Sequence, residues 1–575
     1  MIDFKKEVAQ LISNQVSELT IEEINDILER PVDSKMGDYA FPCFKLAKSL
    51  RKAPNIIAME LGEKLKGCEL FSEVESVNAY VNFFIEKKAF IKASLSEVVR
   101  MDGKFGSSTI GENRKVIVEF SSPNIAKPFH IGHIRSTVIG NSIYKLFDFL
   151  GYDTVRINHL GDYGTQFGKM IVAYRKWGNK EDVEKAPIKT LLEYYVKFHE
   201  EVEAHPELED MARDVFTLLE NGSEEEMELW KWFKDVSLKE FKRVYDILGI
   251  EFDSYAGESF YSDKMGKVID IIKDRNLLVE SEGAMIVDLE AFNLPPALIM
   301  KKDGSTLYLT RDIAAAVYRK ETYDFYKNIY VVASQQNLHF QQLMKVIDLM
   351  GFDWSNQCVH IPFGLVSLED GTMSTRSGRV VYLEDVLNRA IAQTKEIIIE
   401  KDVNTENIEI TAKQVGIGAV IFQELSNGRI KDYVFSWDKV LNFEGETGPY
   451  VQYTYARAAS VLRNSKEDLD KLVVKLNDIE NIDFNFIESD AAYSLVKLIY
   501  RFPEVIIEAA NRYEPSILTR HLVDIAQAFN RFYHDEHILV ANEEEKKAKL
   551  LLVYAAKISL HNGLMLLGIA APERM

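Results

Sequence analysis

The clearest pattern of apolar and polar positions lies between residues 115 and 151. The run from Val116 to Phe120 is compact and mostly apolar, as a buried strand requires. After a loop with two prolines, apolar residues recur at helical spacing from about His130 to Leu150, where Gly151 ends the pattern. The sequence therefore predicts a strand, a loop and a long amphipathic helix.

The same order of elements returns later in the chain. The apolar run from Ile329 to Ser334 is followed by a helical pattern that continues to Gly351. Strands that alternate with helices of this length indicate a parallel sheet of the doubly wound, Rossmann type. Charged helices from about Pro206 to Leu248 and a hairpin at Asp303-Gly304 are expected to interrupt this sheet.

The two ends of the chain carry different patterns. The N-terminal region mixes helical stretches with an alternating segment from Ala79 to Glu86, and helical spacing dominates from about Thr405 onward. We predict a multidomain α/β protein. Its parts are a small N-terminal α+β domain at 1–105, a Rossmann-type parallel-sheet domain at 106–404 with an insertion near 175–250, and a C-terminal all-α helix bundle at 405–575.

Composition places the chain among ordinary globular proteins. Of 575 residues, 47% are hydrophobic and 27% are charged. No window approaches the roughly 18 consecutive apolar residues of a membrane-spanning helix, and charges stand near the N-terminus where a secretory signal is apolar. Three cysteines are too few for a disulfide framework or a cysteine-rich zinc site. We predict a cytoplasmic protein with no membrane partner and no metal site of its own.

The net charge of −20 is at first sight unfavourable for a nucleic-acid partner, because phosphate backbones are usually met by lysine and arginine. Half of this charge is local. Residues 201–230 carry eleven acidic side chains against one basic side chain, Arg213, which is a net −10. We interpret this segment as a solvated helix face. The rest of the surface can still hold basic patches, so the charge does not exclude a nucleic acid.

The segment with the most chemistry starts the helix after the first strand and runs from Pro128 to His133. A helix N-terminus attracts phosphate through its unpaired N–H groups. His130 and His133 share one helix face, and Gly132 lets a base or a phosphate approach closely. We predict that these three residues bind ATP and that the histidines stabilise the charge that develops at its α-phosphate. An ordinary helix start with two half-buried histidines is the alternative.

A second candidate is a loop of small hydroxyl residues between Gly371 and Gly378. Its backbone N–H groups and one cation, Arg376, are suited to folding over a triphosphate. By composition alone, however, a solvated hairpin loop is the better interpretation, because most clusters of glycine, serine and threonine are ordinary loops.

Several segments resemble class I aminoacyl-tRNA synthetases, and arginyl-tRNA synthetases in particular. They are VEFSSPNIAKPFHIGHIRSTVIG (Val118 to Gly140), YLTRDIAAAVYR (Tyr308 to Arg319), YVVASQQNLH (Tyr330 to His339), MSTRSG (Met373 to Gly378), GPYVQYTYAR (Gly448 to Arg457) and the terminal PERM. They follow the family order and span most of the chain, which makes them far more specific than one motif. The resemblance implies an enzyme that joins L-arginine to tRNA(Arg) with ATP, through arginyl-adenylate, and releases pyrophosphate and AMP.

The resemblance also assigns residues to the arginine substrate. A guanidinium group is recognised by carboxylates in a two-pronged geometry, helped by a hydroxyl or amide. Glu258, Tyr308 and Asp312 would hold the guanidinium. The α-amino and carboxylate groups would be held by Glu119, Asn124, His130 and Gln336. Without the resemblance, a loop acid, a helix N-terminal acid and a cap would be the simpler interpretations of Glu258, Asp312 and Gln336.

The loop from Gly371 to Gly378, called the second signature loop below, departs from the KMSKS pattern of class I. Thr372 and Thr375 stand where other members have lysine, and Ser377 stands where many arginyl enzymes have lysine. In this family a lysine just upstream of the HIGH motif, here His130 to His133, takes the place of the missing loop lysines. Lys127 occupies that position. We expect Mg²⁺ to be carried with the nucleotide. The expected catalytic residues are Lys127, His130, His133 and Arg376, with Met373 and Ser374 also at the ATP.

The partner tRNA is expected at the C-terminal bundle. Residues 441–575 hold 15 basic and 20 acidic side chains, so stacking and base-edge hydrogen bonds must supplement phosphate contacts. Tyrosines on helices are more often core residues than base contacts. The resemblance nevertheless favours Tyr533, His537 and Met575 as tRNA contacts, and Tyr453 is a further candidate among the available aromatic residues. It also implies that the N-terminal domain leans on the tRNA elbow and that the enzyme is a monomer.

Two other functions fit part of the sequence. An H-x-G-H nucleotidyltransferase acting on a small metabolite would explain residues 128–133 but not the aromatic C-terminal bundle. A non-catalytic RNA-binding paralogue would keep the bundle and lose a pocket residue. The second is disfavoured because Glu119, Asn124 and the other pocket residues are all present.

Overall fold

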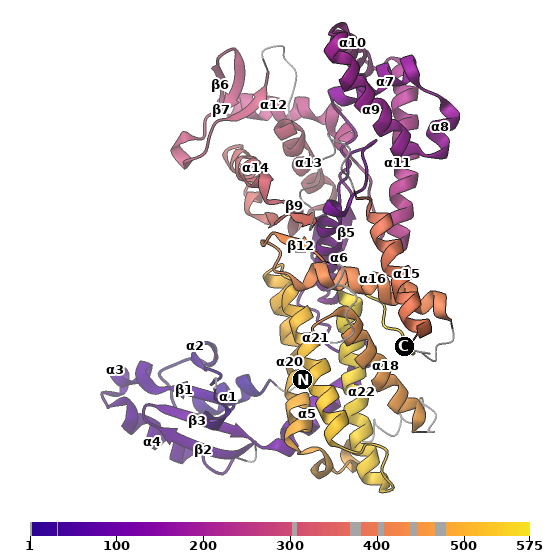
Figure 1. The fold of residues 1–575 in the computed structure, drawn as a ribbon. Helices are drawn as coiled ribbons and strands as arrows, with labels where there is room; N and C mark the ends of the chain where they lie inside the picture. Colours follow the sequence, from indigo (N-terminus) through magenta and orange to yellow (C-terminus); the bar gives the residue numbers. More distant parts are fainter. Residues whose placement is uncertain are drawn as a thin grey trace. The chain divides into compact units, whose positions relative to one another are not determined.

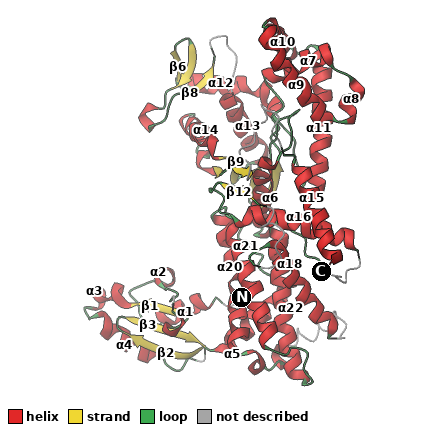
Figure 2. Ribbon diagram, in the orientation of Figure 1, coloured by secondary structure: helices red, strands yellow, loops and turns green. Residues whose placement is uncertain are grey.

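The computed structural model describes residues 3–31, 33–68, 70–301, 308–368, 381–400, 407–436, 445–465 and 479–575. The chain divides into two compact units, and Figure 1 labels the helices and strands that they contain. The larger contains Gly106–Tyr453, Glu504–Val523 and Gly563–Met575, and the smaller contains Met1–Phe105, Thr454–Pro503 and Asp524–Asn562. Helices account for most of the secondary structure in both units (Figure 2).

A four-stranded parallel sheet forms the centre of the larger unit, with strand order β10-β9-β4-β5. Its strands are β4 (Lys115–Glu119), β5 (Asp153–Ile157), β9 (Lys327–Ala333) and β10 (Cys358–Phe363). The chain passes from β4 through α6 (Ile134–Phe149) to β5, and later returns to the other side of β4 as β9. Ligands of open α/β sheets bind beyond the carboxyl ends of the strands where the winding reverses in this way. The predicted Rossmann-type sheet is therefore confirmed.

Strand β4 and helix α6 follow directly from the local pattern. Val116, Ile117 and Val118 are fully buried, as expected for a parallel strand covered on both faces. Helix α6 lies close to this strand at Gly140, where an added Cβ would be 2.1 Å from the Cβ of Phe120. Glycine at this position allows the helix backbone to approach the sheet.

Replacing Gly140 with alanine is expected to destabilise the larger unit. The new methyl group would overlap the Phe120 side chain, and overpacking of this kind costs about 1–3 kcal/mol. The midpoint of thermal unfolding should therefore fall by several degrees. Gly266 is the matched control, because its added Cβ meets no atom within 4 Å and Gly266→Ala should leave the midpoint unchanged or slightly higher. Equal midpoints for the two variants would contradict the close packing.

An all-helical insertion follows β5. Its helices are α7 (Thr165–Trp177), α8 (Lys180–Lys185), α9 (Pro187–Ala204), α10 (Glu207–Glu220) and α11 (Glu224–Leu248). They enclose a small core of their own, which includes Val172, Phe198 and Ala212. Most acidic side chains of the 201–230 segment are exposed, as a solvated face requires. Glu226 is an exception, since it is buried 2.7 Å from Arg175.

A second excursion from the sheet contains short strands that the sequence pattern did not predict. Its elements are α12 (Met265–Asp274), β6 (Leu278–Ser281), β7 (Ala284–Val287), β8 (Ala297–Met300) and α13 (Tyr308–Tyr323), which precedes β9. Helix α14 (Asn337–Leu349) then joins β9 to β10. Strands β6, β7 and β8 form an antiparallel sheet. The hairpin expected at Asp303-Gly304 lies outside the described residues.

The remaining elements of the larger unit are β11 (Val366–Leu368), α15 (Leu383–Glu400), α16 (Ile408–Ser426) and β12 (Tyr433–Phe435). Strands β11 and β12 pair in parallel. The sequence predicted only helices beyond Thr405, so β12 is a departure from that expectation. A strand of three residues is too short to show an alternating pattern.

The smaller unit combines a three-stranded antiparallel sheet of order β1-β3-β2 with helices. Its N-terminal elements are α1 (Phe4–Ser13), α2 (Ile21–Ile27), β1 (Tyr39–Pro42), α3 (Ala47–Leu50), α4 (Pro54–Leu65), β2 (Phe71–Val77), β3 (Tyr80–Ile85) and α5 (Lys87–Met101). Phe4 and Phe90 contact the ring of Tyr500, and Lys497 lies 2.8 Å from Asp38. The N-terminal segment is thus tied to residues 490–503 within this unit.

Four C-terminal helices contribute residues to both units. They are α18 (Gly448–Asn464), α20 (Asp490–Asn511), α21 (Ser516–Asp535) and α22 (Glu543–Leu566). Their presence confirms the predicted helical C-terminal region. Across the described ranges, no helix has the length and apolar character needed to cross a membrane.

Candidate active site

The loop that leaves β4 has an unusual backbone. Ser121, Ser122 and Ala126 have φ angles of 69°, 45° and 59°, although none is glycine. Such conformations cost about 1–3 kcal/mol each, and they occur preferentially at functional sites. Ser237 and Tyr245 of α11 hold the loop, because the Ser237 hydroxyl accepts from the N–H of Ala126 and the Tyr245 hydroxyl lies 2.8 Å from that of Ser121.

The predicted ATP-binding segment forms a short 3-10 helix, η4 (Ile131–His133), that leads into α6. The Nδ1 atom of His130 accepts a hydrogen bond from the N–H of Gly132 at 3.1 Å. A neutral imidazole in this state carries its proton on Nε2, which is then a donor. The His130 and His133 ring centroids lie 4.0 Å apart. Burial lowers the pKa of His130 to about 4 and that of His133 to about 3, so both rings are neutral near pH 7.

The chain on both sides of the second signature loop contacts this segment. The N–H of Ile131 donates to the carbonyl of Val381, and the N–H of Leu383 donates to the carbonyl of Phe129, each at 3.0 Å. Strand β11, on the other side of the loop, also contacts η4. Three predicted site residues, Met373, Ser374 and Arg376, lie outside the described residues.

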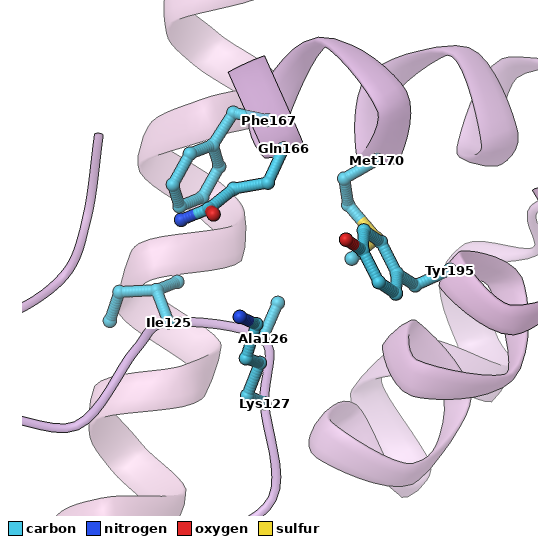
Figure 3. Close-up of a pocket in the computed structure, with 7 residues that line it drawn as sticks. All are labelled: Ile125, Ala126, Lys127, Gln166, Phe167, Met170 and Tyr195. Carbon is cyan, nitrogen blue, oxygen red and sulfur yellow. The ribbon is translucent and has the colours of Figure 1, made fainter. Parts of the chain in front are cut away.

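Lys127 lies at the wall of a small pocket between the β4 loop and the insertion. Figure 3 shows its side chain extending into the space between Ile125 and Tyr195. The residues that line this pocket are Ile125, Ala126, Lys127, Gln166, Phe167, Met170 and Tyr195. The predicted phosphate cation therefore lines the same pocket as residues of helices α7 and α9.

Two of the carboxylates predicted to bind arginine belong to one polar network. Asp312 is 2.6 Å from Nε2 of His339 and 3.7 Å from Nε2 of His159. His159 continues to the fully buried Arg319, which pairs with Glu119 at 2.6 Å. Burial alone would raise the pKa of Asp312, but the two histidines hold it below its usual value.

Glu258 is the third predicted carboxylate, and it is positioned by Asp162. Both the backbone N–H and the hydroxyl of Ser259 donate to Asp162 at 2.8 Å, and Lys234 of α11 pairs with it at 2.6 Å. The Glu258 carboxylate lies 3.5 Å from Arg311. Burial raises the pKa of Glu258 to about 8, although Arg311 opposes this shift.

The other predicted arginine-binding residues are more exposed. Tyr308 begins α13, one helical turn before Asp312, and its side chain is 56% exposed. Gln336 is exposed at the start of α14, just beyond the end of β9. Asn124 is exposed beside Gly161, where an added Cβ would lie 2.2 Å from its amide oxygen. Glu119 ends β4, Asn124 follows it and Gln336 follows the adjacent strand β9, so these three residues are at the carboxyl edge of the sheet.

The predicted tRNA contacts are divided between the units. Tyr533 and His537 belong to the smaller unit and are exposed. The Tyr533 ring lies 5.3 Å from the guanidinium of Arg457 and is stacked on Phe529. Tyr453, 40% exposed, and the half-buried Met575 belong to the larger unit.

Sequence reasoning missed four side chains that hold the site together: His159, Asp162, Arg319 and His339. Arg319 and His339 end two of the quoted family segments, and Arg319 lies seven residues from Asp312, on the same helix face. That spacing is a usable signal. His159 and Asp162 follow β5 with no local pattern that would have singled them out.

Comparisons with known proteins identify the family of the chain. Residues 94–437 match the family model described as tRNA synthetases class I (R), catalytic domain, and residues 5–85 and 451–575 match the arginyl tRNA synthetase N terminal domain and the DALR anticodon binding domain. The arginine–tRNA ligases of Halothermothrix orenii and Clostridioides difficile are 58% and 57% identical over 575 residues, with full coverage of both chains.

Solved structures show the same relationship. The arginyl-tRNA synthetase of Plasmodium falciparum is 26% identical, with a TM-score of 0.80 and coverage of 100% of this chain and 99% of that chain. The Thermus thermophilus arginyl-tRNA synthetase, 24% identical, shares the fold with a TM-score of 0.81 over 100% of both chains.

The Rossmann-type sheet and the long catalytic-domain match define a class I aminoacyl-tRNA synthetase. The full-length identity to curated relatives is more specific than the class. The chain belongs to the arginine–tRNA ligase family, whose function is the ATP-dependent aminoacylation of tRNA(Arg) with arginine. The enzyme class inferred from the ordered motifs is therefore confirmed.

Proposed function

We propose that the chain charges tRNA(Arg) in two steps at the carboxyl edge of β4 and β9. The arginine carboxylate attacks the α-phosphorus of ATP and releases pyrophosphate, which leaves arginyl-adenylate. The 2′-hydroxyl of the terminal adenosine of the tRNA then attacks the activated carbonyl, and AMP leaves. The observation that carries this proposal is that the His130–His133 segment and the carboxylate of Glu119 follow or end β4, the strand at which the sheet reverses its winding.

We assign the guanidinium group of arginine to Glu258, Tyr308 and Asp312. The ionised Asp312 and the Tyr308 hydroxyl, one helical turn apart, suit the two-pronged donor pattern of a guanidinium. The α-amino and carboxylate groups are assigned to Glu119, Asn124, His130 and Gln336, which lie at or after the ends of β4 and β9. Arg319 balances the charge of Glu119 and holds its orientation.

Arginine binding should strengthen as the pH rises through about 8. The neutral form of Glu258 must lose its proton before it can pair with a guanidinium, and its raised pKa places that loss near pH 8. The KM for arginine is expected to fall roughly tenfold between pH 6.5 and 8.5. Glu258→Gln carries no titrating group and should have a higher KM that changes less with pH. Parallel pH profiles for the wild type and this variant would exclude Glu258 from the pocket.

Neither step requires a side-chain nucleophile, so we propose catalysis by positioning and charge stabilisation. His130 and His133 are assigned to stabilise the charge that develops at the α-phosphate, and Nδ1 of His130 accepts from the N–H of Gly132, which leaves Nε2 as the donor atom of that ring. Gly132, Met373 and Ser374 contribute to the same nucleotide site, and Lys127 and Arg376 supply positive charge. Mg²⁺ is proposed as part of the ATP substrate, bound through phosphate oxygens as this ion usually is.

We propose that Tyr453, Tyr533, His537 and Met575 contact the tRNA. Tyr533 supports this role, because an exposed ring with Arg457 beside it is suited to stacking on a base. Residues 1–105 are assigned to the tRNA elbow, 106–404 to catalysis and 405–575 to the anticodon. A monomer in the cytoplasm is proposed as the working form, which agrees with three unpaired cysteines.

The direct test is arginine-dependent exchange between ATP and labelled pyrophosphate, with and without total tRNA. Lysine and glutamine serve as control amino acids. Exchange with arginine and tRNA only is expected, because adenylate formation in this family is proposed to need bound tRNA. Exchange without tRNA would support the arginyl-adenylate intermediate but contradict the proposed requirement for bound tRNA. Absence of exchange in every mixture would contradict the proposed pathway.

A further inference from the structure

Arg135 is a fully buried arginine in the first turn of α6, two residues after His133. One nitrogen, Nη1, donates to the carbonyl oxygens of Gly364 at 3.0 Å and Lys431 at 2.7 Å. Its Nε atom lies 3.6 Å from the carboxylate of Glu424, and both side chains are completely shielded from solvent. A guanidinium with its counter-ion is thus enclosed at the first turn of α6, two residues after His133.

The two carbonyl groups that Arg135 binds belong to residues that stand just before β11 and β12 in the chain. The N–H of Gly364 donates to the carbonyl of Arg429 at 2.8 Å, and the N–H of Tyr433 donates to that of Leu365 at 3.1 Å. Gly364 also lies so close to the second segment that an added Cβ would be 2.6 Å from the backbone of Lys431. Arg135 therefore secures both chain segments to the start of α6.

Strand β11 ends at Leu368, and the chain returns at Val381, whose carbonyl accepts from Ile131 of η4. The chain between them carries the predicted ATP-binding residues Met373 and Ser374. Strand β11 on one side of that stretch and residues 381–383 on the other side therefore both contact η4 or the residues just before it. Arg135 makes the connection on the upstream side, and backbone hydrogen bonds make it on the downstream side.

Stability alone does not explain a charged pair at this position. Taking two charges out of water costs several kcal/mol per ion, and well-packed apolar residues of similar volume are often as stabilising or more so. An arginine does offer something that an apolar residue cannot, because its planar group holds several carbonyl oxygens in a fixed arrangement. Nη1 bonds to the carbonyl oxygens of Gly364 and Lys431, and Nη2 lies 3.5 Å from that of Gly428, so two nitrogens of one planar group reach three carbonyl oxygens.

We propose that Arg135, with Glu424 as its counter-ion, is a positioning residue for the ATP-dependent step. It fixes β11 and β12 against the start of α6, so that the histidines and the chain entering the second signature loop keep one relative geometry. This inference rests on the proposed ATP site at residues 130–133. Arg135 itself does not touch the substrate.

Two variants separate positioning from folding. Arg135→Lys keeps a charge beside Glu424 but replaces the planar fork with a single ammonium group. The double variant Arg135→Met/Glu424→Leu removes both charges and should restore the midpoint of thermal unfolding to near the wild-type value. Both variants should raise the KM for ATP or lower kcat by about 10- to 100-fold in tRNA charging, because small displacements of a reacting geometry are costly. The KM for arginine should remain within about twofold.

Two reference variants make the result decisive. Arg175→Lys changes an arginine–carboxylate pair of the insertion and should leave all kinetic constants unchanged. His130→Asn reports on the proposed ATP site. A well-folded double variant with wild-type ATP kinetics would overturn the proposal for Arg135 if His130→Asn impairs ATP use. If neither affects ATP use, the proposed ATP site at residues 130–133 fails and the proposal for Arg135 fails with it. Equal increases in the KM values for ATP and arginine would also overturn it, because they indicate general disorder of the site.

Discussion

Replacing Asp312 with asparagine is expected to lower kcat/KM for arginine roughly 100- to 1000-fold, mainly through KM. The substitution keeps the size of the side chain and removes the charge that pairs with the guanidinium. It also leaves His339, 2.6 Å away, with a neutral partner. Arginine-dependent tRNA charging at saturating ATP measures the effect, and the KM for ATP should stay close to that of the wild type.

Asp324 offers a matched control just beyond the end of the same helix. Its side chain is 90% exposed and pairs with Lys320 at 2.9 Å. Surface pairs of this kind contribute little, so Asp324→Asn should leave the charging kinetics unchanged. If Asp312→Asn behaved like Asp324→Asn, the assignment of the guanidinium to Asp312 would be wrong.

Replacing His130 with asparagine is expected to lower kcat for charging roughly 100- to 1000-fold. Asparagine is a good N-cap, so it can still accept from the N–H of Gly132 and preserve the helix start. It cannot place a donor where Nε2 of the imidazole lies. The loss should therefore appear in the rate of adenylate formation, measured by single-turnover kinetics, with an unchanged midpoint of thermal unfolding.

His360 provides the comparison for this experiment. It lies on β10 of the same sheet, bonds to the carbonyl of Val332 at 2.9 Å and stacks on Phe340. His360→Gln should retain the wild-type rate within about twofold. A wild-type rate for His130→Asn would restore the alternative interpretation, in which His130 and His133 merely begin a helix.

The sequence predicted the parts of the fold that depend on local patterns. The run from Val116 to Phe120 became β4 with a shift of one residue, and the pattern from His130 to Leu150 became η4 and α6. Strands β6, β7, β8 and β12, which have three or four residues each, were not predicted, and neither were the longer strands β2, β5 and β10. Strands of three or four residues are fixed by their neighbours in space rather than by their own residues.

The candidate site shows the same limit. Neighbouring residues such as His130 and His133 could be related to one another by spacing, and the ordered motifs indicated the protein family. The network of Glu119, His159, Asp312, Arg319 and His339 joins residues from four elements or loops, and no single stretch of sequence contains that information. The roles assigned to individual residues stay predictions until the variants above are measured.

Helix α11 has a consequence for attempts to build a smaller enzyme. Ser237 and Tyr245 bond to the strained loop after β4, while Trp230 and Lys234 bond to Asp162. The last helix of the insertion is therefore part of the scaffold of the catalytic loops. A shortened enzyme that dispensed with Glu224–Leu248 would release these loops together, so any minimal version must retain this helix as an internal strut.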